Sequence, residues 1–531
     1  MEEKRKVIFN DQFENKIKEG IDLLADAVMS TMGPKGKLVL IQKEDSHPIV
    51  TKDGVTVANA INLKDDLKNM GVKIIKEAAS RTADEAGDGT TTSTVLARSI
   101  YSEGLKMKSA GYQVNGLKRG IEKGLKLIKK ELLKRKKDIT TKEEINQVAL
   151  ISANGEKDIA DMIVTAIDKS GPDGSIIVES AKGFKSELIT VDGFKINRGF
   201  LSPYFVTDKN KMNAIFNKPL VLICDREFTS IHDLLKPLEA GLEAGKPILL
   251  ICNEISGDAM QGLVLNKTKG SLRICAIKSP GFGASRHEML LDMQTIVGGS
   301  IIDSSFDMSK FSREDFGVCE KAIIHKNMSM IISKETDTKK ESIDIRIKAI
   351  RKRLKEKYSL AEGEEEILIY RLQQLSGGIS ILRIGAATES ELIERYDRVD
   401  DALNAAKAAI LEGILPGGGT SLLKISQNLK QVAQEIKNQN ERAGVEILAK
   451  ALQEPFLQII RNGNEPAEVI LEKIITSKDN VGYDSRKDRF GNMYEMGIVD
   501  PHKVVRCAIE NAVSAAVMLL CVDCCLIQEK D

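Results

Sequence analysis

The sequence contains no tryptophan and few other aromatic residues, with 8 Tyr and 14 Phe among 531 residues. This scarcity disfavours the aromatic platforms on which nucleic-acid bases stack. Acidic and basic residues nearly balance, for a formal net charge of +1, so the sequence also lacks the excess of Lys and Arg that a nucleic-acid surface requires. We therefore expect no nucleic-acid partner.

Long apolar runs are absent as well. No stretch approaches the roughly 20 apolar residues that span a bilayer. The opening MEEKRKVIFN has no apolar core of the kind that a signal peptide carries. We expect a soluble, cytoplasmic protein with no membrane partner.

The eight cysteines do not form a recognisable framework. In a chain of this length they fit reduced, mostly buried thiols better than a set of disulfides. Cys521, Cys524 and Cys525 lie close together, but no second CxxC pair or His pair stands at zinc-ligand spacing. Because the surrounding NAVSAAVMLLCVDCC is apolar, packing is the preferred interpretation and a metal site the minor alternative.

The first third of the chain has the periodicity of helices. Apolar residues in 11–32 recur at steps of three and four, and Gly33-Pro34 ends that pattern. The sequence predicts helices at 11–32, 66–85, 92–109 and 115–135, and a short strand at 38–41.

The middle of the chain changes character. Short apolar runs at 219–224, 247–252 and 272–278 have the length of buried strands, and helical stretches at 231–244 and 256–268 lie between them. This alternation predicts a parallel sheet with helical crossovers. The sequence further predicts two charged helices in 342–375 around a turn near Gly363, whose charges we interpret as a solvated face, then a strand at 379–385 and helices from about 389 to the end.

This order defines the expected fold class as multidomain, α plus α/β. The first and last thirds are expected to form one mostly helical domain, interrupted by an inserted α/β domain. At 531 residues the chain is long enough for two or more domains.

The common nucleotide motifs, GxxxxGK[ST] and GxGxxG, are missing, but other glycine-rich segments are present. Thr31–Gly36 lies at the end of a predicted helix and before a predicted strand, and Gly87-Asp88-Gly89-Thr90-Thr91-Thr92 precedes a predicted helix. Hydroxyls and free N–H groups at a helix N-terminus bind anions, and Asp88 is placed to hold a Mg²⁺ that bridges phosphate oxygens. A helix cap after a tight Asp-Gly turn explains the second segment equally well.

Two further carboxylates and one loop stand out without local support. Asp53 in TKDGVTV and Asp401 in RVDDALNAA are far apart in the sequence, and nothing local indicates that they meet. Pro416-Gly417-Gly418-Gly419-Thr420 taken alone is only a loop.

Ten motifs occur in the order in which group I (GroEL-type) chaperonins carry them. They are TMGPKGK, VTKDGVTVA, AGDGTTTSTVLA, ISANG, RGFLSPYF, SPGFG, GAATE, DALNAAKAAI, LPGGGTSLL and FGNMYEMGIVDP. The chain resembles this family from about residue 5 to about residue 525, and ten motifs in register are far more specific than any one of them.

The resemblance implies a GroEL-like division into three domains. Residues 1–135 and 413–531 would form the equatorial ATP-binding domain, 136–192 and 379–412 the intermediate domain, and 193–378 the apical substrate-binding domain. Gly193 and Gly377–Gly378 fall at the implied hinge, where glycine absorbs large changes of φ and ψ.

The resemblance also implies a site for ATP and Mg²⁺, with K⁺ as a further cation. The implied ATP-binding residues are Thr31, Met32, Gly33, Pro34, Lys52, Asp88 (the Mg²⁺ ligand), Gly89, Thr90, Thr91, Thr92, Gly418, Asp484, Ser485, Arg486 and Asp500. Asp500 would bind the ribose, and the segment 484–486 would face the adenine. Asp401 would orient or activate the attacking water, with support from Asp53. Positioning and charge neutralisation of this kind carry most of the catalysis in phosphoryl transfer.

The inserted domain carries candidate client-binding residues. Ile231, Leu235, Leu238 and Leu242 form one helical stripe, which by default is core, whereas 259–265 has too wide an apolar arc for a single buried stripe. The resemblance implies that non-native chains and a co-chaperonin contact Phe200, Tyr204, Phe205, Leu235, Leu238, Met260, Val264, Leu265 and Asn266. A flexible Met in such a set suits promiscuous binding.

The implied function is that of an ATP-driven chaperonin, a homo-heptamer of one or two rings that folds client proteins with or without a GroES-type partner. Leu457 stands where double-ring members commonly carry an Arg that pairs across the rings with a Glu, for which Glu465 is the candidate. We hypothesise that this contact is weakened and that single rings are populated. The alternatives are a holdase or scaffold without ATP-driven action, which would not need the carboxylates, and a small-molecule kinase, for which no acceptor pocket is identifiable.

Overall fold

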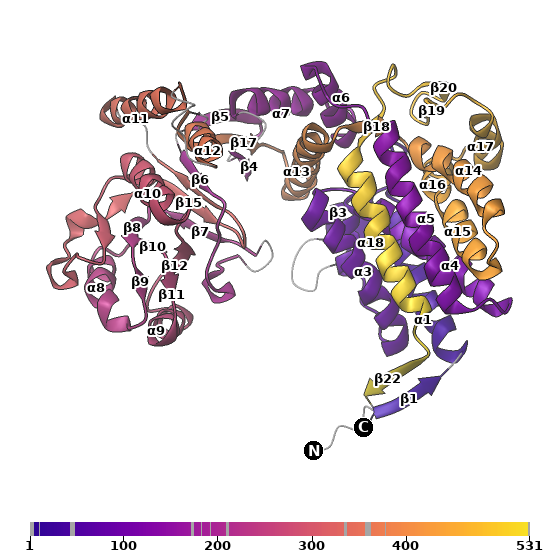
Figure 1. Cartoon of the computed structure of the whole chain (residues 1–531), viewed down its shortest axis with the longest axis horizontal. Helices are drawn as coiled ribbons and strands as arrows, with labels where there is room; N and C mark the ends of the chain where they lie inside the picture. The colour runs from indigo at the N-terminus through magenta and orange to yellow at the C-terminus, as the bar shows by residue number, and fades with distance from the viewer. Residues whose placement is uncertain are drawn as a thin grey trace. The chain divides into compact units, whose positions relative to one another are not determined.

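The computed structural model (Figure 1) describes residues 5–9, 11–42, 48–170, 175–181, 183–191, 193–208, 212–333, 337–355, 363–376 and 379–528. The chain forms two compact units: one contains residues 1–164, 180–186 and 384–531, and the other contains residues 165–179 and 187–383. The expected multidomain α plus α/β fold is confirmed. The three-domain boundaries stay a prediction, and Gly377–Gly378 lie outside the described residues.

The first unit is mainly helical. Its helices are α1 (Asp11–Met29), α2 (Gly54–Ala60), α3 (Asp66–Ala86), α4 (Thr90–Ser109), α5 (Val114–Arg135), α6 (Lys142–Ser152), α13 (Glu389–Glu412), α14 (Thr420–Glu435), α15 (Gln439–Ala451), α16 (Glu454–Asn462), α17 (Ala467–Ile475) and α18 (His502–Leu520), with α7 (Lys157–Ser170) running into the second unit. Figure 1 shows α18 beside α3 and α5. Helices α3, α4 and α5 match the predicted ranges to within two residues.

Helix α1 shows how the pattern produces the core. Phe13, Ile17, Ile21 and Leu24 are buried on one face, as the steps of three and four require. The helix ends at Met29 rather than at residue 32, and Gly33 follows with a left-handed φ of 81°. The predicted end was therefore three residues too late, because apolar spacing continues through the turn that leaves the helix.

Helices α5 and α15 pack backbone to backbone. A Cβ on Gly120 would lie 2.1 Å from the carbonyl oxygen of Glu441, and a Cβ on Gly444 would lie 2.3 Å from that of Leu117. Gly116, like Gly120, is buried at this contact. Only glycine permits the crossing at this distance.

Short strand pairs lie in the first unit. They are β1 (Arg5–Phe9) with β22 (Cys524–Gln528), β2 (Val39–Ile41) with β3 (Ile49–Thr51), β18 (Ile414–Pro416) with β21 (Val499–Pro501), and β19 (Val481–Asp484) with β20 (Arg489–Asn492), all antiparallel. Two of them, β1–β22 and β18–β21, join segments far apart in the sequence. The prediction of helices to the end of the chain was wrong, since α18 stops at Leu520 and β22 follows. Strand β22 is defined by a partner at the opposite end of the sequence, which no local pattern reveals.

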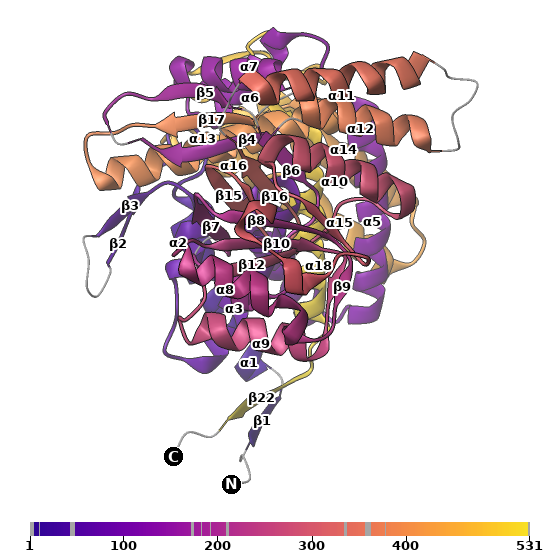
Figure 2. The same cartoon turned by 90° about the vertical axis from the view of Figure 1, so that its left-hand side faces the viewer.

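The second unit contains the predicted parallel sheet. Strands β8 (Leu220–Asp225), β10 (Ile248–Cys252), β12 (Ile274–Lys278) and β13 (Ile301–Asp303) run parallel in the order β12-β10-β8-β13, and β14 (Gly317–Val318) pairs antiparallel with β8. In Figure 2, α8 (Leu235–Glu243) and α9 (Gly257–Thr268) lie on one side of the sheet and α10 (Gly283–Val297) on the other. The parallel sheet with helical crossovers is thus confirmed.

The sequence did not predict the smaller elements of the second unit. An antiparallel sheet has the order β6-β16-β15-β7 and a three-stranded sheet the order β4-β17-β5. Their strands are β4 (Ser175–Ser180), β5 (Glu187–Val191), β6 (Gly193–Ile196), β7 (Ala214–Asn217), β15 (Lys321–Ile324), β16 (Ser329–Ile332) and β17 (Ile379–Ile384), of which only β17 was predicted. Two-residue strands β9 (Glu227–Phe228) and β11 (Glu254–Ile255) pair, and short 3₁₀ turns occupy η1 (Pro203–Phe205), η2 (Ile231–Leu234), η3 (Met308–Lys310) and η4 (Arg313–Asp315).

The two charged helices are α11 (Asp337–Lys355) and α12 (Glu364–Ser376). Their charges are not all a solvated face, which corrects the sequence interpretation. Arg346 of α11 and Arg371 of α12 both donate to Asp292 of α10, whose side chain is 0% exposed, and both also pair with Glu288. The two helices are therefore tied to the sheet domain through a buried carboxylate.

None of the helices that the structure describes combines the length and the apolarity that crossing a bilayer requires.

Candidate active site

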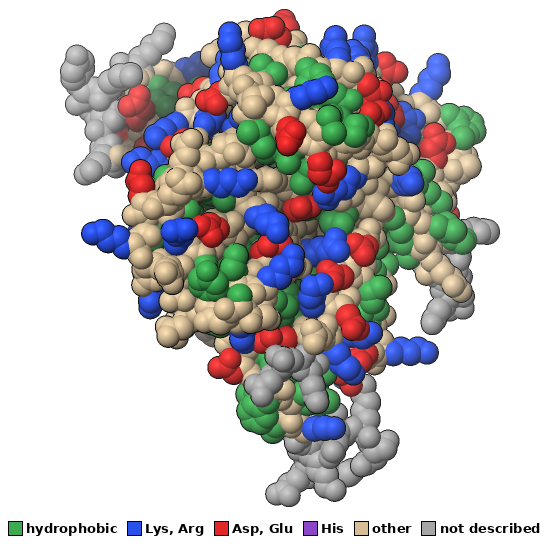
Figure 3. Space-filling model, turned by 90° about the vertical axis from the view of Figure 1, so that its right-hand side faces the viewer, with side chains coloured by type: hydrophobic (Ala, Val, Ile, Leu, Met, Phe, Trp, Pro, Cys, Tyr) green, Lys and Arg blue, Asp and Glu red, His purple; other side chains and the backbone are tan. Residues whose placement is uncertain are grey.

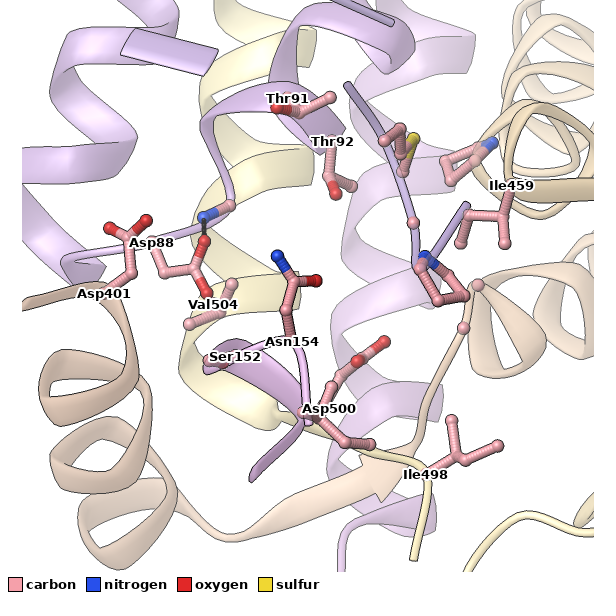
Figure 4. Close-up of a pocket in the computed structure, with 18 of the residues that line it drawn as sticks. Asp88, Thr91, Thr92, Ser152, Asn154, Asp401, Ile459, Ile498, Asp500 and Val504 are labelled. Atoms are coloured by element: carbon pink, nitrogen blue, oxygen red, sulfur yellow. Dashed lines mark hydrogen bonds between the residues drawn. The ribbon is translucent and has the colours of Figure 1, made fainter. Parts of the chain in front are cut away.

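A cavity of about 470 Å³ opens in the first unit, in the size range of small-molecule sites. The turn after α1, the starts of α2 and α4, the loop after α6, helix α13, the loop 417–419, the β19–β20 hairpin and strand β21 all contribute to its walls. Segments from both ends of the sequence therefore build one site (Figure 4).

The start of α4 presents an uncapped helix N-terminus to this cavity. Gly87 and Gly89 both have left-handed φ values, of 74° and 91°, and Gly89 is the N-cap without any side-chain cap bond. The Asp88 carboxylate accepts a hydrogen bond from the Gly89 N–H at 2.5 Å. Thr91 and Thr92 lie on the first turn beside it (Figure 4). No side chain supplies the cap that was the alternative interpretation, and the geometry suits an anion.

Three carboxylates converge beside this helix end. Burial, with the nearby charge of Asp53, raises the pKa of Asp88 to about 6. Burial together with Asp88 and Asp53 raises the pKa of Asp401 well above its usual range. Figure 4 shows Asp88 and Asp401 side by side. Asp53 is fixed as the N-cap of α2, where it accepts from Val55 and Thr56. Like charges this close favour a bound cation.

The donors available here are hard oxygens, which Mg²⁺ prefers. Within the described residues no group of three or more His, Cys, Asp or Glu side chains is arranged as a metal cage. Mg²⁺ in phosphate sites commonly takes one or two carboxylates and completes its shell with water and phosphate oxygens. The residues present thus fit Mg²⁺ held jointly with a phosphorylated ligand.

The opposite end of the cavity is less charged. Asp500 follows Val499 on β21 and accepts from the backbone N–H groups of Gly418 and Gly419, while burial raises its pKa to about 7. Ile459 and Ile498 provide apolar wall there (Figure 4), and a Cβ on Gly33 would lie 3.0 Å from Ile459. A polar anchor with apolar walls suits a nucleoside.

The basic side chains at the site contact other groups of the protein. Lys52 donates from Nζ to the Gly33 carbonyl at 2.9 Å, and burial, followed by Arg398 and Arg486, lowers its pKa. Arg398 pairs with Glu156 and Glu394. Arg486 donates from Nη2 to the carbonyl of Asn154 at 2.5 Å.

All the residues that the resemblance places at the catalytic and ATP-binding site line this cavity. Their roles stay a prediction, and two side chains differ from expectation. Asp484 uses Oδ1 to accept from the N–H groups of Arg486 and Lys487, and the Arg486 guanidinium contacts Asn154 rather than standing free to face a base.

The sequence did not assign several lining residues. Ser152 is the last residue of α6 and Asn154 lies in the turn after it, and Glu394, Asp397 and Arg398 lie on α13 one to two turns before Asp401. The motif ISANG pointed to the first pair, because it was among the matching segments, but no role was attached to it.

Part of the predicted client surface is exposed. The exposed fraction is 67% for Tyr204, 41% for Leu235 and 53% for Leu265, and Asn266 is also exposed. Phe200, Met260 and Val264 are half-buried against the core. Leu242, at 53%, shows that the stripe containing Leu235 is not simply core.

Two assignments to this surface require correction. Phe205 is fully buried and Leu238 is 8% exposed, so neither side chain presents surface to a client in this structure. Phe205 closes the turn η1 and packs into the core of the second unit, and Leu238 faces the same core from α8. Sequence likeness alone does not separate the supporting residues of a surface from those that form it.

Leu457 also lies differently from expectation. It is 6% exposed and packs with Leu423, Phe456 and Ile460, so it cannot be a surface position that lost an ion pair. The guanidinium on this part of the surface belongs to Arg461, which pairs with Glu454 and Glu468 of the same chain. Figure 3 shows Lys and Arg interspersed with Asp and Glu across one face of the molecule.

Residues 24–530 match the model of the TCP-1/cpn60 chaperonin family, so the chain belongs to this family. The chain is also similar to two crystal structures of the chaperonin gp146 from the bacteriophage EL 2 (Pseudomonas aeruginosa), determined in the presence of ATP-BeFx. The TM-scores are 0.67 and 0.64, with sequence identities of 23% and 22%, and each match covers 99% of both chains. The fold is that of a GroEL-like chaperonin, and the family supports a chaperone function.

Proposed function

We propose that this chain is a subunit of a ring-shaped chaperonin that hydrolyses Mg-ATP and uses the cycle to bind and release non-native proteins. The observation that carries this proposal is the convergence of Asp53, Asp88 and Asp401 beside the uncapped N-terminus of α4. A passive scaffold has no need for three costly carboxylates at an anion site.

We assign each group of residues at the cavity a role from its position. Residues 89–92 receive phosphate oxygens on backbone N–H and hydroxyl groups, and Asp500 and the glycine loop hold the sugar. Mg²⁺ supplies neutralisation of phosphate charge, and Asp88 is the residue that would hold it. Asp401 orients a water for attack on the terminal phosphorus and accepts its proton, while the bond to the leaving ADP oxygen breaks. Asp53, fixed as the N-cap of α2, supports that water.

Hydrolysis is tested by Asp401→Ala. The variant should bind Mg-ATP with near-normal affinity but turn it over at least about a hundredfold more slowly, the typical scale for losing a general base. The matched control is Asp400→Ala, which removes an exposed carboxylate from the same helix outside the cavity. Normal turnover in Asp401→Ala would refute the catalytic assignment.

Client binding is proposed for the exposed apolar residues of α8, α9 and η1. Leu235, Leu265 and Tyr204 are exposed on elements that contact one another directly or through η2, and exposed apolar residues that lie together mark partner sites. Leu265→Ser should weaken capture of a chemically unfolded protein, whereas Ile345→Ser, 66% exposed on α11, should not. Client refolding that is equal with and without ATP would favour a holdase instead.

Ring assembly is proposed through the two-stranded ribbons of the first unit. The β1–β22 ribbon exposes Phe9 (60%) and Leu526 (52%), and the β2–β3 ribbon exposes Leu40 (69%), with Leu38 (58%) just before it. Such ribbons have unpaired edges that a second copy can extend. Native mass measurement should show rings of seven subunits. A protein that stays monomeric would refute assembly through these ribbons, and the buried Leu457 no longer favours one ring over two.

A further inference from the structure

Arg486 projects from a rigid turn at the rim of the cavity. The turn joins β19 to β20, and Asp484 fixes it by accepting from the N–H groups of Arg486 and Lys487 at 3.0 and 3.2 Å. Lys35 adds an ion pair to Asp488 at 2.7 Å. The Arg486 guanidinium therefore extends from a turn that hydrogen bonds and an ion pair hold in place.

The partner of Arg486 is the turn that follows α6. Asn154 and Gly155 both have left-handed φ values, of 55° and 87°. Arg486 Nη2 donates to the Asn154 carbonyl at 2.5 Å, and a Cβ on Gly155 would lie 2.1 Å from Nη1. The guanidinium thus lies directly on this turn, and a side chain at residue 155 would displace it.

The turn after α6 is also a wall of the cavity. Ser152 and Asn154 line it, and Figure 4 shows both between Asp88 and Asp500, hence beside the space that a bound nucleotide would occupy. The bond from Arg486 joins this wall to the hairpin on the nucleoside side. Burial is the main cause of the lowered pKa of Lys52, and the charges of Arg398 and Arg486 are further causes. The charge of Arg486 therefore acts within the cavity.

We propose that Arg486 is a positioning residue that clamps the 154–155 turn against the β19–β20 hairpin and thereby sets the rate at which the nucleotide product leaves. The inference rests on the proposed function and adds a regulatory role for a residue that sequence likeness placed against the base. Release requires one wall of the cavity to move, and the clamp opposes that movement. Product release commonly limits turnover in enzymes of this kind.

The test compares full-length wild type, Arg486→Ala and Arg489→Ala by stopped-flow displacement of a fluorescent ADP analogue in the presence of Mg²⁺. Arg489 lies on the same hairpin and is exposed outside the cavity. It pairs at 3.5 Å with Oδ2 of Asp484, whereas the N–H groups of the turn bond to Oδ1, so removing Arg489 leaves those bonds in place. Arg486→Ala should release ADP about tenfold faster, the scale of one partly exposed charged hydrogen bond, with a much smaller change in the association rate. Arg489→Ala should match wild type.

The outcomes separate the clamp from the ATPase proposal. Release at the wild-type rate in Arg486→Ala, from a protein that binds and hydrolyses ATP, overturns the clamp alone. A changed preference between ADP and GDP without faster release assigns Arg486 to base reading and also overturns it. A wild-type protein that binds no nucleotide overturns both. Equal thermal midpoints of the nucleotide-free variants are expected, and faster release with an unchanged midpoint cannot come from a misfolded hairpin.

Discussion

The substitution Asp500→Asn measures how much a buried charged carboxylate at the cavity lowers the stability of the folded protein when no ligand is bound. The carboxylate accepts from the N–H groups of Gly418 and Gly419, yet burial and the charge of Asp88 raise its pKa from 3.8 to about 7. The two backbone donors therefore do not compensate the loss of hydration. Asn keeps an oxygen to accept these bonds and carries no charge.

The sign of the pH dependence follows from that shift. Between about pH 4 and pH 7 the folded protein holds a proton on Asp500 that the unfolded chain has released, so stability falls as pH rises across this window. Above about pH 7 both states are ionised and the loss is complete. A difference of about three pH units corresponds to at most about 4 kcal/mol. Asp500 is only half-buried by surface area, and water in the cavity reduces the expected effect by roughly twofold to threefold, to about 1–2 kcal/mol.

The assay is the thermal unfolding midpoint of nucleotide-free, Mg²⁺-free protein at matched concentration, at pH 5.5 and pH 8.5. Asp500→Asn should unfold at a higher temperature than wild type at pH 8.5, and the difference between the two midpoints should be about half as large at pH 5.5, near the middle of the window. Asp400→Asn changes an exposed carboxylate on α13 and serves as the control, which should show no such pH-dependent difference from wild type. A variant that is no more stable than wild type at pH 8.5, or an offset that is the same at both pH values, would refute the reasoning.

Two further predictions concern packing and buried charge. Gly120→Ala would place a Cβ 2.1 Å from the Glu441 carbonyl oxygen and should lower stability by roughly 1–3 kcal/mol or more, whereas Gly183→Ala meets nothing within 4 Å and should be nearly neutral in the same denaturant titration. Arg371→Leu removes one of the two guanidinium partners of the fully buried Asp292 and should destabilise the second unit by about 3–5 kcal/mol, seen as faster proteolysis there. Adding Asp292→Leu should recover part of that loss, and a loss that instead doubles would contradict the buried-charge explanation.

Local pattern predicted most of the regular structure. Apolar periodicity predicts burial. In α1 the steps of three and four mark the buried face of the helix, and the apolar runs of β8, β10 and β12 mark strands that are buried on both faces. The pattern failed for β22, because its partner β1 lies at the other end of the chain. It also failed for the charges of α11 and α12, because Asp292, which pairs with Arg346 and Arg371, belongs to another helix.

The sequence by itself determined the family likeness and the helical and α/β character of the two parts. It also identified residues that gather at the cavity, because motifs that match a family in order are expected to occupy the same places in the fold. Only the tertiary structure decided what each side chain does there. Phe205, Leu238 and Leu457 turned out to be buried, since an apolar side chain at a motif position serves either a surface or its support. The meeting of Asp53, Asp88 and Asp401, and the contact of Arg486 with Asn154, arise between segments far apart in the chain, where only folding creates the distances on which charge and hydrogen bonding depend.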